Sequence, residues 1–384
     1  MSRPGAILAD WNTTGIGRFV TCEGLVKAMK EKDVAVLSHG ATGRGNDQMR
    51  FERYTNVLAP NMAVYAPWRD AGLLEEFPGR SEMAAYLNKF GIEAFVGPKK
   101  KYSTDANLAG LSHEAEDLES VETSMLIVEP EMGKWPAEAP DAIEEVELQF
   151  EAGRCVALNG KRMTPLQVIT EANTIGGRNG IGVSHALENR IIGTKSRGAA
   201  PTAPPHSNPV HPPADSTAPV SLCRTALAPS HPSLLAHCAG VYEAPGMQLL
   251  GQALEFVYQA VLDRRATKLF SHLSDLVSDQ IYDGRWFDPT TVASMIAIKE
   301  LTKLATGRIR VGAYKGNIFF VKMDQVPHSL YNEADSSMEA SDGLNPVSSQ
   351  GYAEIQAVEA RSLALAGQIA APVAKPAAKR ARHA

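Results

Sequence analysis

Apolar and polar positions follow a recognisable order in the first part of the chain. Between residues 21 and 33, apolar side chains recur at helical spacing among lysines and glutamates, and a short apolar run follows at residues 34–37. This order predicts a helix and then a buried strand. A polar, glycine-rich segment at residues 38–47 comes directly after the strand and leads into a charged segment. Helix, strand, glycine-rich turn and helix indicate an α/β domain with a parallel sheet, which binds ligands at the carboxyl ends of its strands.

The pattern of residue types changes after about residue 90. A second strand is predicted at residues 62–66 and a helix at residues 81–90, ending at Gly91, where a C-cap glycine is expected. Three later segments are rich in β-forming residues: 121–128, 144–150 and 155–158. They predict an α+β region with antiparallel strands.

The segment 199–240 interrupts this pattern. It holds nine prolines and four histidines but only two charged residues, Asp215 and Arg224. Such a composition is not expected to pack as helix or sheet. We interpret the segment as a disordered Pro-rich insertion, either translated intron or a lineage-specific loop.

Regular structure is predicted again in the last third of the chain. Helical periodicity covers residues 244–304, and a hairpin is predicted at residues 309–322. An amphipathic helix at residues 352–369 could pack on another subunit or on its own chain. The short basic tail, residues 370–384, is expected to be disordered.

These features divide the chain into four parts. Residues 1–90 are expected to form an α/β domain of the parallel-sheet type, and residues 91–346 an α+β region that contains the insertion. Residues 347–369 are expected to form a C-terminal helix, and the basic tail follows.

Composition narrows the class of ligand. The chain has 384 residues, 44% of them hydrophobic, and a net charge of -5. That balance gives no positive field for nucleic acid or an anionic membrane, and small metabolites fit better. We expect a cytoplasmic location because the first residues lack a signal peptide, no apolar run is long enough to span a membrane, and the four cysteines show no pairing motif.

The glycine-rich turn carries the most informative chemistry. Its glycines, Gly40, Gly43 and Gly45, allow backbone N–H groups to approach a phosphate or ribose, so with Thr42 they are candidate nucleotide-binding residues. Thr42, Asn46 and Asp47 add hydroxyl, amide and carboxylate groups at the same strand end. An ordinary strand-to-helix turn has similar glycines, so spacing alone leaves both readings open.

Four motifs in order carry a family resemblance. They are HGATGRGNDQ at residues 39–48, APWR at 66–69, YSTDANL at 102–108, and ENRIIGTKSRG at 188–198. The chain resembles argininosuccinate synthase from about Trp11 to Ile369, apart from the insertion. The resemblance implies a homotetrameric ligase of arginine biosynthesis and the urea cycle that condenses citrulline with aspartate, with ATP as co-substrate and Mg²⁺ accompanying the nucleotide. It also implies that residues 1–90 are a partial nucleotide-binding domain of the ATP pyrophosphatase type, residues 91–346 a synthetase or substrate domain, and residues 347–369 an oligomerisation helix.

The resemblance also implies roles for individual residues. The family's aspartate-binding residues match Thr42, Asn46 and Asp47. Its citrulline-binding residues match Asn46, Arg50, Ser103, Ser112, Glu188 and Tyr242. Arg50 suits a carboxylate because its planar fork can donate two parallel hydrogen bonds. Without the motif, a surface ion pair with Asp47 one turn earlier would be the favoured explanation of Arg50.

The chain departs from the family pattern in three places. The family's SGGxDTS loop, which holds pyrophosphate, does not occur, and a tyrosine and a serine that contact citrulline are replaced by Asp10 and Gly15. The Pro-rich insertion interrupts the sequence between Gly198 and Val241. The alternative function is therefore an impaired member that only binds aspartate or citrulline, or that assembles with a complete paralogue.

Overall fold

The computed structural model describes residues 12–43, 45–92, 102–193, 195–197, 240–337, 339, 343 and 345–369. The chain divides into two compact units, Met1–His328 and Ser329–Ala384. Asp10, almost all of the Pro-rich insertion and the basic tail lie outside the described residues.

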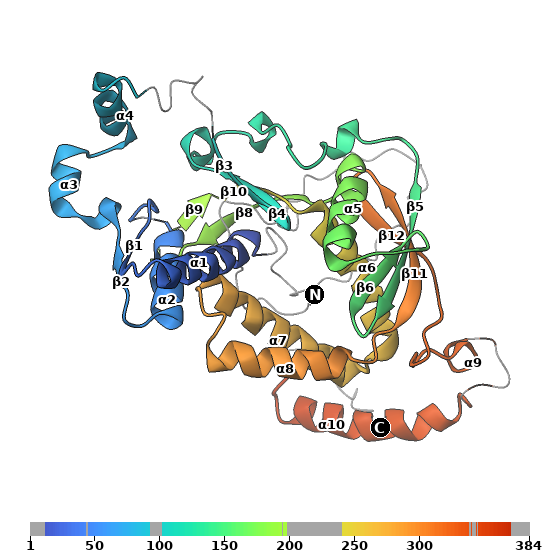
Figure 1. The fold of residues 1–384 in the computed structure, drawn as a ribbon. Helices are drawn as coiled ribbons and strands as arrows, with labels where there is room; N and C mark the ends of the chain where they lie inside the picture. The colour runs from blue at the N-terminus through green and yellow to red at the C-terminus, as the bar shows by residue number, and fades with distance from the viewer. Residues whose placement is uncertain are drawn as a thin grey trace, which may run out of the picture. The chain divides into compact units, whose positions relative to one another are not determined.

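The first unit begins with an α/β layer, as predicted. Its elements are α1 (Thr13–Glu31), β1 (Val36–Ser38), α2 (Asp47–Leu58) and β2 (Ala63–Tyr65). The two strands pair in parallel, with Leu37 opposite Val64, and α1 packs against α2 (Figure 1). The predicted parallel sheet is confirmed.

The first strand differs from its prediction in length and burial. It begins at Val36 rather than Val34, and both side chains are exposed, whereas Leu37 is buried. An apolar run predicts a strand covered on both faces. Among the described residues, this sheet has two strands, and only one side of β1 is covered by packed side chains.

Short helices follow β2: η1 (Pro67–Arg69), α3 (Ala71–Glu76) and α4 (Arg80–Lys89). Asp70 begins α3 by accepting hydrogen bonds from the backbone N–H groups of Gly72 and Leu73. After α4 the backbone turns left-handed at Gly91, with φ of 69°. The glycine expected at this helix end is therefore confirmed.

Two antiparallel sheets make up most of the remaining first unit. The first has the order β3-β4-β10-β8-β9, and the second has the order β12-β11-β5-β6-β7. The strands of the first sheet are β3 (Ser103–Asn107), β4 (Gly110–Glu114), β8 (Val183–Asn189), β9 (Lys195–Arg197) and β10 (Gly240–Glu243). The strands of the second are β5 (Glu144–Glu151), β6 (Arg154–Leu158), β7 (Lys161–Arg162), β11 (Gly307–Tyr314) and β12 (Asn317–Asp324). The predicted α+β region is thus confirmed.

The main core lies between the second sheet and the helices that cover it. These helices are α5 (Pro165–Arg178), α6 (Pro245–Val261), α7 (Arg264–Tyr282) and α8 (Pro289–Thr302). On β5, alternate residues Val146, Leu148 and Phe150 are buried, as expected for a strand with one face on the core. Leu249 and Val257 of α6 are fully buried in the same cluster.

One predicted strand is wrong. Residues 121–128 were expected to form a strand, but they contain the 3-10 turn η3 (Met125–Ile127), started by the Ser124 hydroxyl accepting from Leu126 N–H. Side-chain hydrogen bonding to the local backbone competes with strand pairing. The helical periodicity predicted at residues 244–304 is confirmed, and it corresponds to the three helices α6, α7 and α8. Asp263 caps α7, and Gly284, with φ of 75°, follows its end.

Two further 3-10 turns and the second unit complete the description. The turns η2 (Glu116–Glu119) and η4 (Pro136–Glu138) belong to the first unit. The second unit contains α9 (Glu333–Ser336) and α10 (Ser348–Leu365), which confirms the predicted C-terminal helix. Over the described part of the chain, every helix is too short or too polar to cross a bilayer.

Candidate functional site

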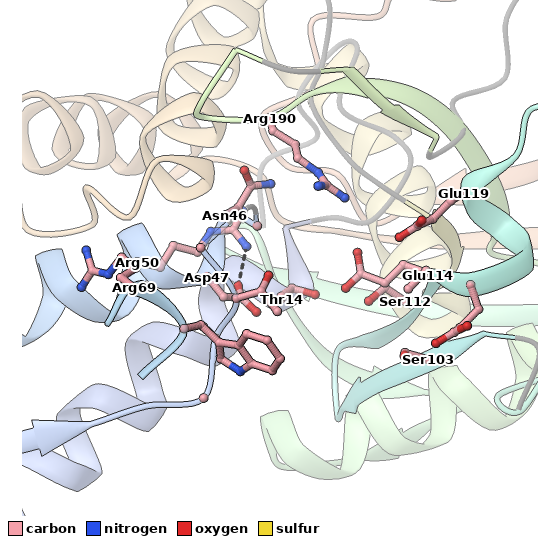
Figure 2. Close-up of a pocket in the computed structure, with 18 of the residues that line it drawn as sticks. Thr14, Asn46, Asp47, Arg50, Arg69, Ser103, Ser112, Glu114, Glu119 and Arg190 are labelled. Carbon is pink, nitrogen blue, oxygen red and sulfur yellow. Dashed lines mark hydrogen bonds and ion pairs between the residues drawn. The ribbon is translucent and has the colours of Figure 1, made fainter. Parts of the chain in front are cut away.

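A pocket of about 1060 Å³ lies at the carboxyl end of β1. The glycine-rich turn and the start of α2 form one wall, and β3, β4 and η2 form the facing wall. In Figure 2, Asn46, Asp47 and Arg50 lie on one side, and Ser103, Ser112 and Glu114 lie on the other. The position agrees with the rule that α/β folds bind ligands where parallel strands end.

All of the site residues predicted from the sequence line this pocket except Glu188. They are Gly40, Thr42, Gly43, Gly45, Asn46, Asp47, Arg50, Ser103, Ser112 and Tyr242. The side chain of Glu188 lies outside the described part of the structure. Its backbone belongs to β8 and pairs with Ser196 of β9.

The antiparallel sheet explains why residues distant in sequence meet here. Tyr242 of β10 lies directly opposite Ser112 of β4, and Ser103 of β3 lies opposite Glu114. Alternate residues of a strand point to the same face. Ser112 and Glu114 therefore both face the pocket, while His113 points to the opposite face of the sheet.

Asp47 is the centre of an ionic network. One carboxylate oxygen accepts hydrogen bonds from Arg18 Nε at 2.9 Å and Arg18 Nη2 at 2.8 Å, and the other accepts from Arg50 Nη1 at 3.0 Å. Arg18 also contacts Asp105. Burial disfavours the charged form of Asp47, but the Arg50 and Arg18 guanidiniums outweigh burial and hold its pKa below the ordinary value. Asp47 is thus an anion facing the pocket.

Arg50 is buried rather than placed on the surface. Its side chain is 5% exposed, its Nε donates to the carbonyl oxygen of Tyr282 at 2.8 Å, and its guanidinium carbon lies 4.9 Å from the centre of the Tyr282 ring. The ion pair with Asp47 that the alternative reading proposed is present. Its description as a surface pair is wrong, because the pair lines the pocket.

Asn46 links three parts of the first unit. Its Nδ2 donates to the Tyr282 hydroxyl at 2.7 Å, and its Oδ1 accepts from the backbone N–H of Ile191 at 2.9 Å. Gln48 Nε2 donates to the Gly43 carbonyl oxygen at 2.7 Å and so holds the glycine-rich turn. These bonds fix the turn relative to α7 and to the end of β8.

The three glycines of the turn differ in how closely they are packed, and none has an unusual backbone geometry. The backbone of Gly40, Gly43 and Gly45 is not left-handed. A Cβ atom at Gly43 would lie 3.2 Å from the carbonyl oxygen of Trp68, whereas one at Gly40 would enter open space. The backbone at Gly40 is therefore accessible to a ligand.

An acidic wall faces the turn. It consists of Glu114, Glu116 and Glu119. Burial, and then the neighbouring charge of Asp47, raise the pKa of Glu114 to about 7, while Arg190 opposes the shift. A pKa near neutrality lets this carboxyl be neutral or charged depending on the ligand beside it.

A buried pair supports the wall from behind. His113 Nε2 lies 2.8 Å from Glu243 Oε1, and both side chains are at most 1% exposed. Glu243 also accepts from the backbone N–H groups of Glu131 and Met132 at 2.9 and 2.7 Å. The pair joins β4 to β10 and so fixes the spacing of Ser112 and Tyr242 in the pocket.

Several pocket residues were not predicted from the sequence. Glu114 could have been found, because it lies two positions after Ser112 in a strand and so faces the same way. Arg190 lies inside a recognised motif but had no assigned role. Arg18 and Tyr282 gave no local signal, because each meets the turn only through tertiary packing.

The residues present suit polar, charged ligands. Three arginines and several carboxylates line the pocket together with neutral hydroxyl and amide groups. Across the described positions, no three His, Cys, Asp or Glu side chains are grouped to hold a metal ion. A parallel-strand turn facing a polar antiparallel sheet across one pocket defines a small-molecule-binding protein of the nucleotide-binding α/β class.

Comparison with known proteins gives the family. The N-terminal HUP domain of arginosuccinate synthase matches residues 10–93, and the arginosuccinate synthase C-terminal domain matches residues 102–205 and 236–363. An argininosuccinate synthase of Rhodopirellula baltica is 33% identical over 349 residues, which cover 91% of this chain and 76% of the relative. The chain belongs to the argininosuccinate synthase family, a family of ligases.

Proposed function

We propose that this protein condenses citrulline with aspartate at the expense of ATP, giving argininosuccinate, AMP and pyrophosphate. The observation that carries the proposal is the single pocket lined by residues matching the family's amino-acid ligands, with Asp47 held as an anion by Arg18 and Arg50. A zwitterionic ligand needs both signs of charge at short range, and this pocket supplies both.

Aspartate is proposed to bind at the glycine-rich turn. The Asp47 carboxylate would pair with the ammonium group of aspartate, and Thr42 and Asn46 would donate to its carboxylates. Asn46 is suitable because Tyr282 and Ile191 fix its amide plane. The pairing leaves the aspartate amine beside the site where citrulline is activated.

Citrulline is proposed to lie against the facing wall. Arg50 would hold its carboxylate, with Asn46 also in contact. Neutral and acidic groups would receive its ammonium and ureido groups: Ser103, Ser112, Glu188 and Tyr242. The ureido oxygen would then attack the α-phosphate of ATP, releasing pyrophosphate. The aspartate amine would displace AMP from the resulting citrullyl-AMP.

The nucleotide is proposed to approach the backbone of the turn at Gly40, Thr42, Gly43 and Gly45. The open space beside Gly40 and the N-terminus of α2 suit a phosphate. Mg²⁺ would arrive with the nucleotide, since this ion is bound largely through phosphate oxygens and water. It would supply charge neutralisation at the phosphates, while the chain positions the two amino acids.

We also propose a homotetramer located in the cytoplasm and working in arginine biosynthesis or the urea cycle. Support for self-association comes from α10, in which none of the residues is buried and Tyr352, Ile355 and Val358 are each more than half exposed. Exposed apolar side chains at helical spacing favour packing against another helix.

The proposed reaction can be tested by following the ureido oxygen atom of citrulline. Purified protein is supplied with ATP, Mg²⁺, aspartate and citrulline carrying ¹⁸O in its ureido group. We expect pyrophosphate release and ¹⁸O in the AMP, because the ureido oxygen leaves with the adenylate. Binding of both amino acids without turnover would support the narrower function of a ligand-binding family member. No turnover and no binding of either amino acid would contradict both.

A further inference from the structure

One step of the proposed condensation requires a base. The amine of aspartate is an ammonium group at neutral pH, and it must lose a proton before its nitrogen can attack citrullyl-AMP. We infer that Glu114 is the general base that removes this proton. The inference rests on the proposed function and adds a catalytic residue to it. Glu114 is the last residue of β4 and lines the pocket on the wall that faces Asp47 (Figure 2).

The sheet places the Glu114 carboxyl group in the pocket. Ser112 and Glu114 alternate with His113 along β4, so both of them point to the pocket face. Glu114 pairs with Ser103 of the neighbouring strand, and the buried His113 is held from behind by Glu243. In the part of the chain that the structure describes, the Glu114 carboxyl group forms no hydrogen bond or ion pair. Its oxygens can therefore accept a proton from a ligand.

Asp47 is unsuited to be this base, although it also faces the pocket. The hydrogen bonds from Arg18 and Arg50 stabilise its charged form and hold its pKa below the ordinary value. A carboxylate that is stabilised as an anion has little tendency to accept a proton. Asp47 suits the other task, which is to hold the ammonium group while Glu114 takes the proton.

Glu114 has the opposite electrostatic surroundings. Burial, and then the nearby charge of Asp47, disfavour its charged form and raise its pKa to about 7. Two carboxyl groups whose surroundings separate their pKa values in this way can divide the tasks of charge stabilisation and proton transfer. A base with a pKa near neutrality is ionised in part before the ligand arrives and still accepts a proton readily. The charged groups around Glu114 are Asp47 and Arg50 of α2, Asp105 of β3, Arg190 after β8, and Glu116 and Glu119 of η2.

Proton transfer precedes the formation of the new bond. The Glu114 carboxylate takes one proton from the ammonium group, which leaves a neutral amine. The nitrogen lone pair then forms a bond to the ureido carbon of citrullyl-AMP, and the bond from this carbon to the adenylate oxygen breaks, so AMP leaves with that electron pair. A second proton on the same nitrogen passes to the leaving phosphate as the guanidinium group forms. Glu114 returns its proton to water when the products leave.

Two assays separate the step that needs the base from the step that precedes it. Citrulline-dependent exchange of labelled pyrophosphate into ATP, without aspartate, measures the formation of citrullyl-AMP. Argininosuccinate production with all three substrates measures the whole reaction. The variants are Glu114→Gln, which removes the base, and Glu114→Asp, which keeps a carboxyl group on a shorter side chain. Glu23→Gln is the control, because Glu23 is exposed on α1 and lies outside the pocket.

In Glu114→Gln we expect argininosuccinate production to fall about 100-fold or more, the usual contribution of a general base. Pyrophosphate exchange should stay close to that of wild type, because the ureido oxygen attacks ATP without giving up a proton. Glu114→Asp should recover part of the lost rate, and Glu23→Gln should match wild type. Far-UV circular dichroism and the thermal midpoint confirm that each variant is folded.

The pH profile gives a readout that a purely structural role would not change. With wild-type protein, argininosuccinate production should rise with pH while the Glu114 carboxyl group loses its proton, and should then level off. With Glu114→Gln, the rate should keep rising at alkaline pH, because the ammonium group must then lose its proton to water.

Three outcomes overturn the inference. If Glu114→Gln makes argininosuccinate as fast as wild type, or its rate levels off at the same pH, Glu114 is not the base. If the variant loses exchange and production to the same degree, Glu114 acts on citrulline or on the fold instead. In both cases the proposed function stands. If the wild-type protein makes no argininosuccinate, the proposed function fails and the inference fails with it.

Discussion

Asp47 pairs with two arginines of the fold, and the same carboxylate is proposed to bind the ammonium group of aspartate. It accepts three hydrogen bonds from two arginines, and its side chain is still 27% exposed towards the pocket. The arginines stabilise the charged form, so the anion is ready for a cationic group. The same pairing joins α1 to α2 through Arg18. Loss of the charge should therefore affect both stability and ligand binding.

Asp47→Asn should lower the free energy of unfolding at pH 7 by about 1–3 kcal/mol, because Arg18 and Arg50 lose a charged acceptor. The folded-state pKa of Asp47 is lowered. The contribution is thus complete above the ordinary value, near 4, and is lost as the pH falls through the lower folded-state value.

Urea unfolding of wild type and Asp47→Asn at pH 7 and below pH 4 checks this prediction. The difference between the proteins should be present at pH 7 and shrink in acid. Asp33→Asn, at an exposed side chain just after α1, is the control. A difference that is the same at both pH values would argue against a charge-based role.

Glu114 should show the opposite pH dependence. Its pKa is raised from 4.5 to about 7, chiefly by burial, so the folded state binds more protons than the unfolded state between these values. Wild-type stability should lose this contribution as the pH rises through that window, and Glu114→Gln should not. The gain of the variant over wild type should grow by about 1–3 kcal/mol between pH 5 and pH 8. Equal differences at both pH values, measured by urea unfolding, would contradict the raised pKa.

The sequence motifs predicted which residues share the pocket, but they did not predict the hydrogen bonds that position those residues. Thr42, Ser103 and Tyr242 were predicted to share one site, and they line one pocket. The hydrogen bonds that position the site could not be predicted, because they join the turn to residues more than 140 positions away, at Ile191 and Tyr282. Pairings of this kind depend on tertiary packing and leave no local pattern.

At the scale of elements, α5 shows how glycine permits close packing. A Cβ atom added at Gly177 would lie 2.1 Å from the carbonyl oxygen of Met132 and 3.1 Å from the Cα of Gly133. Both neighbours are backbone atoms that cannot turn aside. The Met132 backbone is also bound by Glu243, so this contact connects α5 to the sheet behind the pocket.

Gly177→Ala should therefore destabilise the fold by about 3 kcal/mol through overpacking. The matched control is Gly24→Ala in α1, where an added Cβ meets nothing within 4 Å. There, alanine should stabilise the helix by up to about 1 kcal/mol, since glycine is the poorer helix former. Urea unfolding midpoints measure both. A Gly177→Ala variant as stable as Gly24→Ala would show that α5 can move away from the Met132 loop.

The elements that the sequence predicted best were those whose turn residues and flanking strand residues lie next to each other in the chain. The hairpin of β11 and β12 was expected from Lys315 and Gly316, and both residues adopt the left-handed backbone of a tight turn. Residues 121–128 were wrongly predicted as a strand, because their apolar and β-branched residues lie in an irregular segment. Leu126 in this segment is 69% exposed. Composition could not distinguish such a segment from a strand, because the local sequence does not determine whether a segment finds a neighbouring strand to pair with.

At the scale of the whole molecule, the first unit brings a parallel-strand turn and an antiparallel sheet around one pocket, while the second unit offers an exposed helix. The pocket takes residues from α2, β3, β4, β10 and the end of α7. Its geometry therefore depends on the folding of the whole first unit. Self-association through α10 can be altered separately, because none of the pocket residues belongs to the second unit.

The final prediction separates assembly from folding. Ile355 and Val358 of α10 are 69% and 56% exposed and lie three positions apart, on one side of the helix. Ile355→Glu combined with Val358→Glu places two charges where an apolar contact between copies is proposed. Light scattering after size-exclusion chromatography should find a smaller assembly than wild type, because burying unpaired carboxylates is costly.

The control combines Gln350→Glu with Gln356→Glu, which adds the same charge at exposed polar positions of the helix and should leave the mass unchanged. Because the first unit keeps its own core, aspartate binding by the Ile355/Val358 variant should persist. A wild-type protein that is monomeric, or equal masses for the two double variants, would refute assembly through this helix.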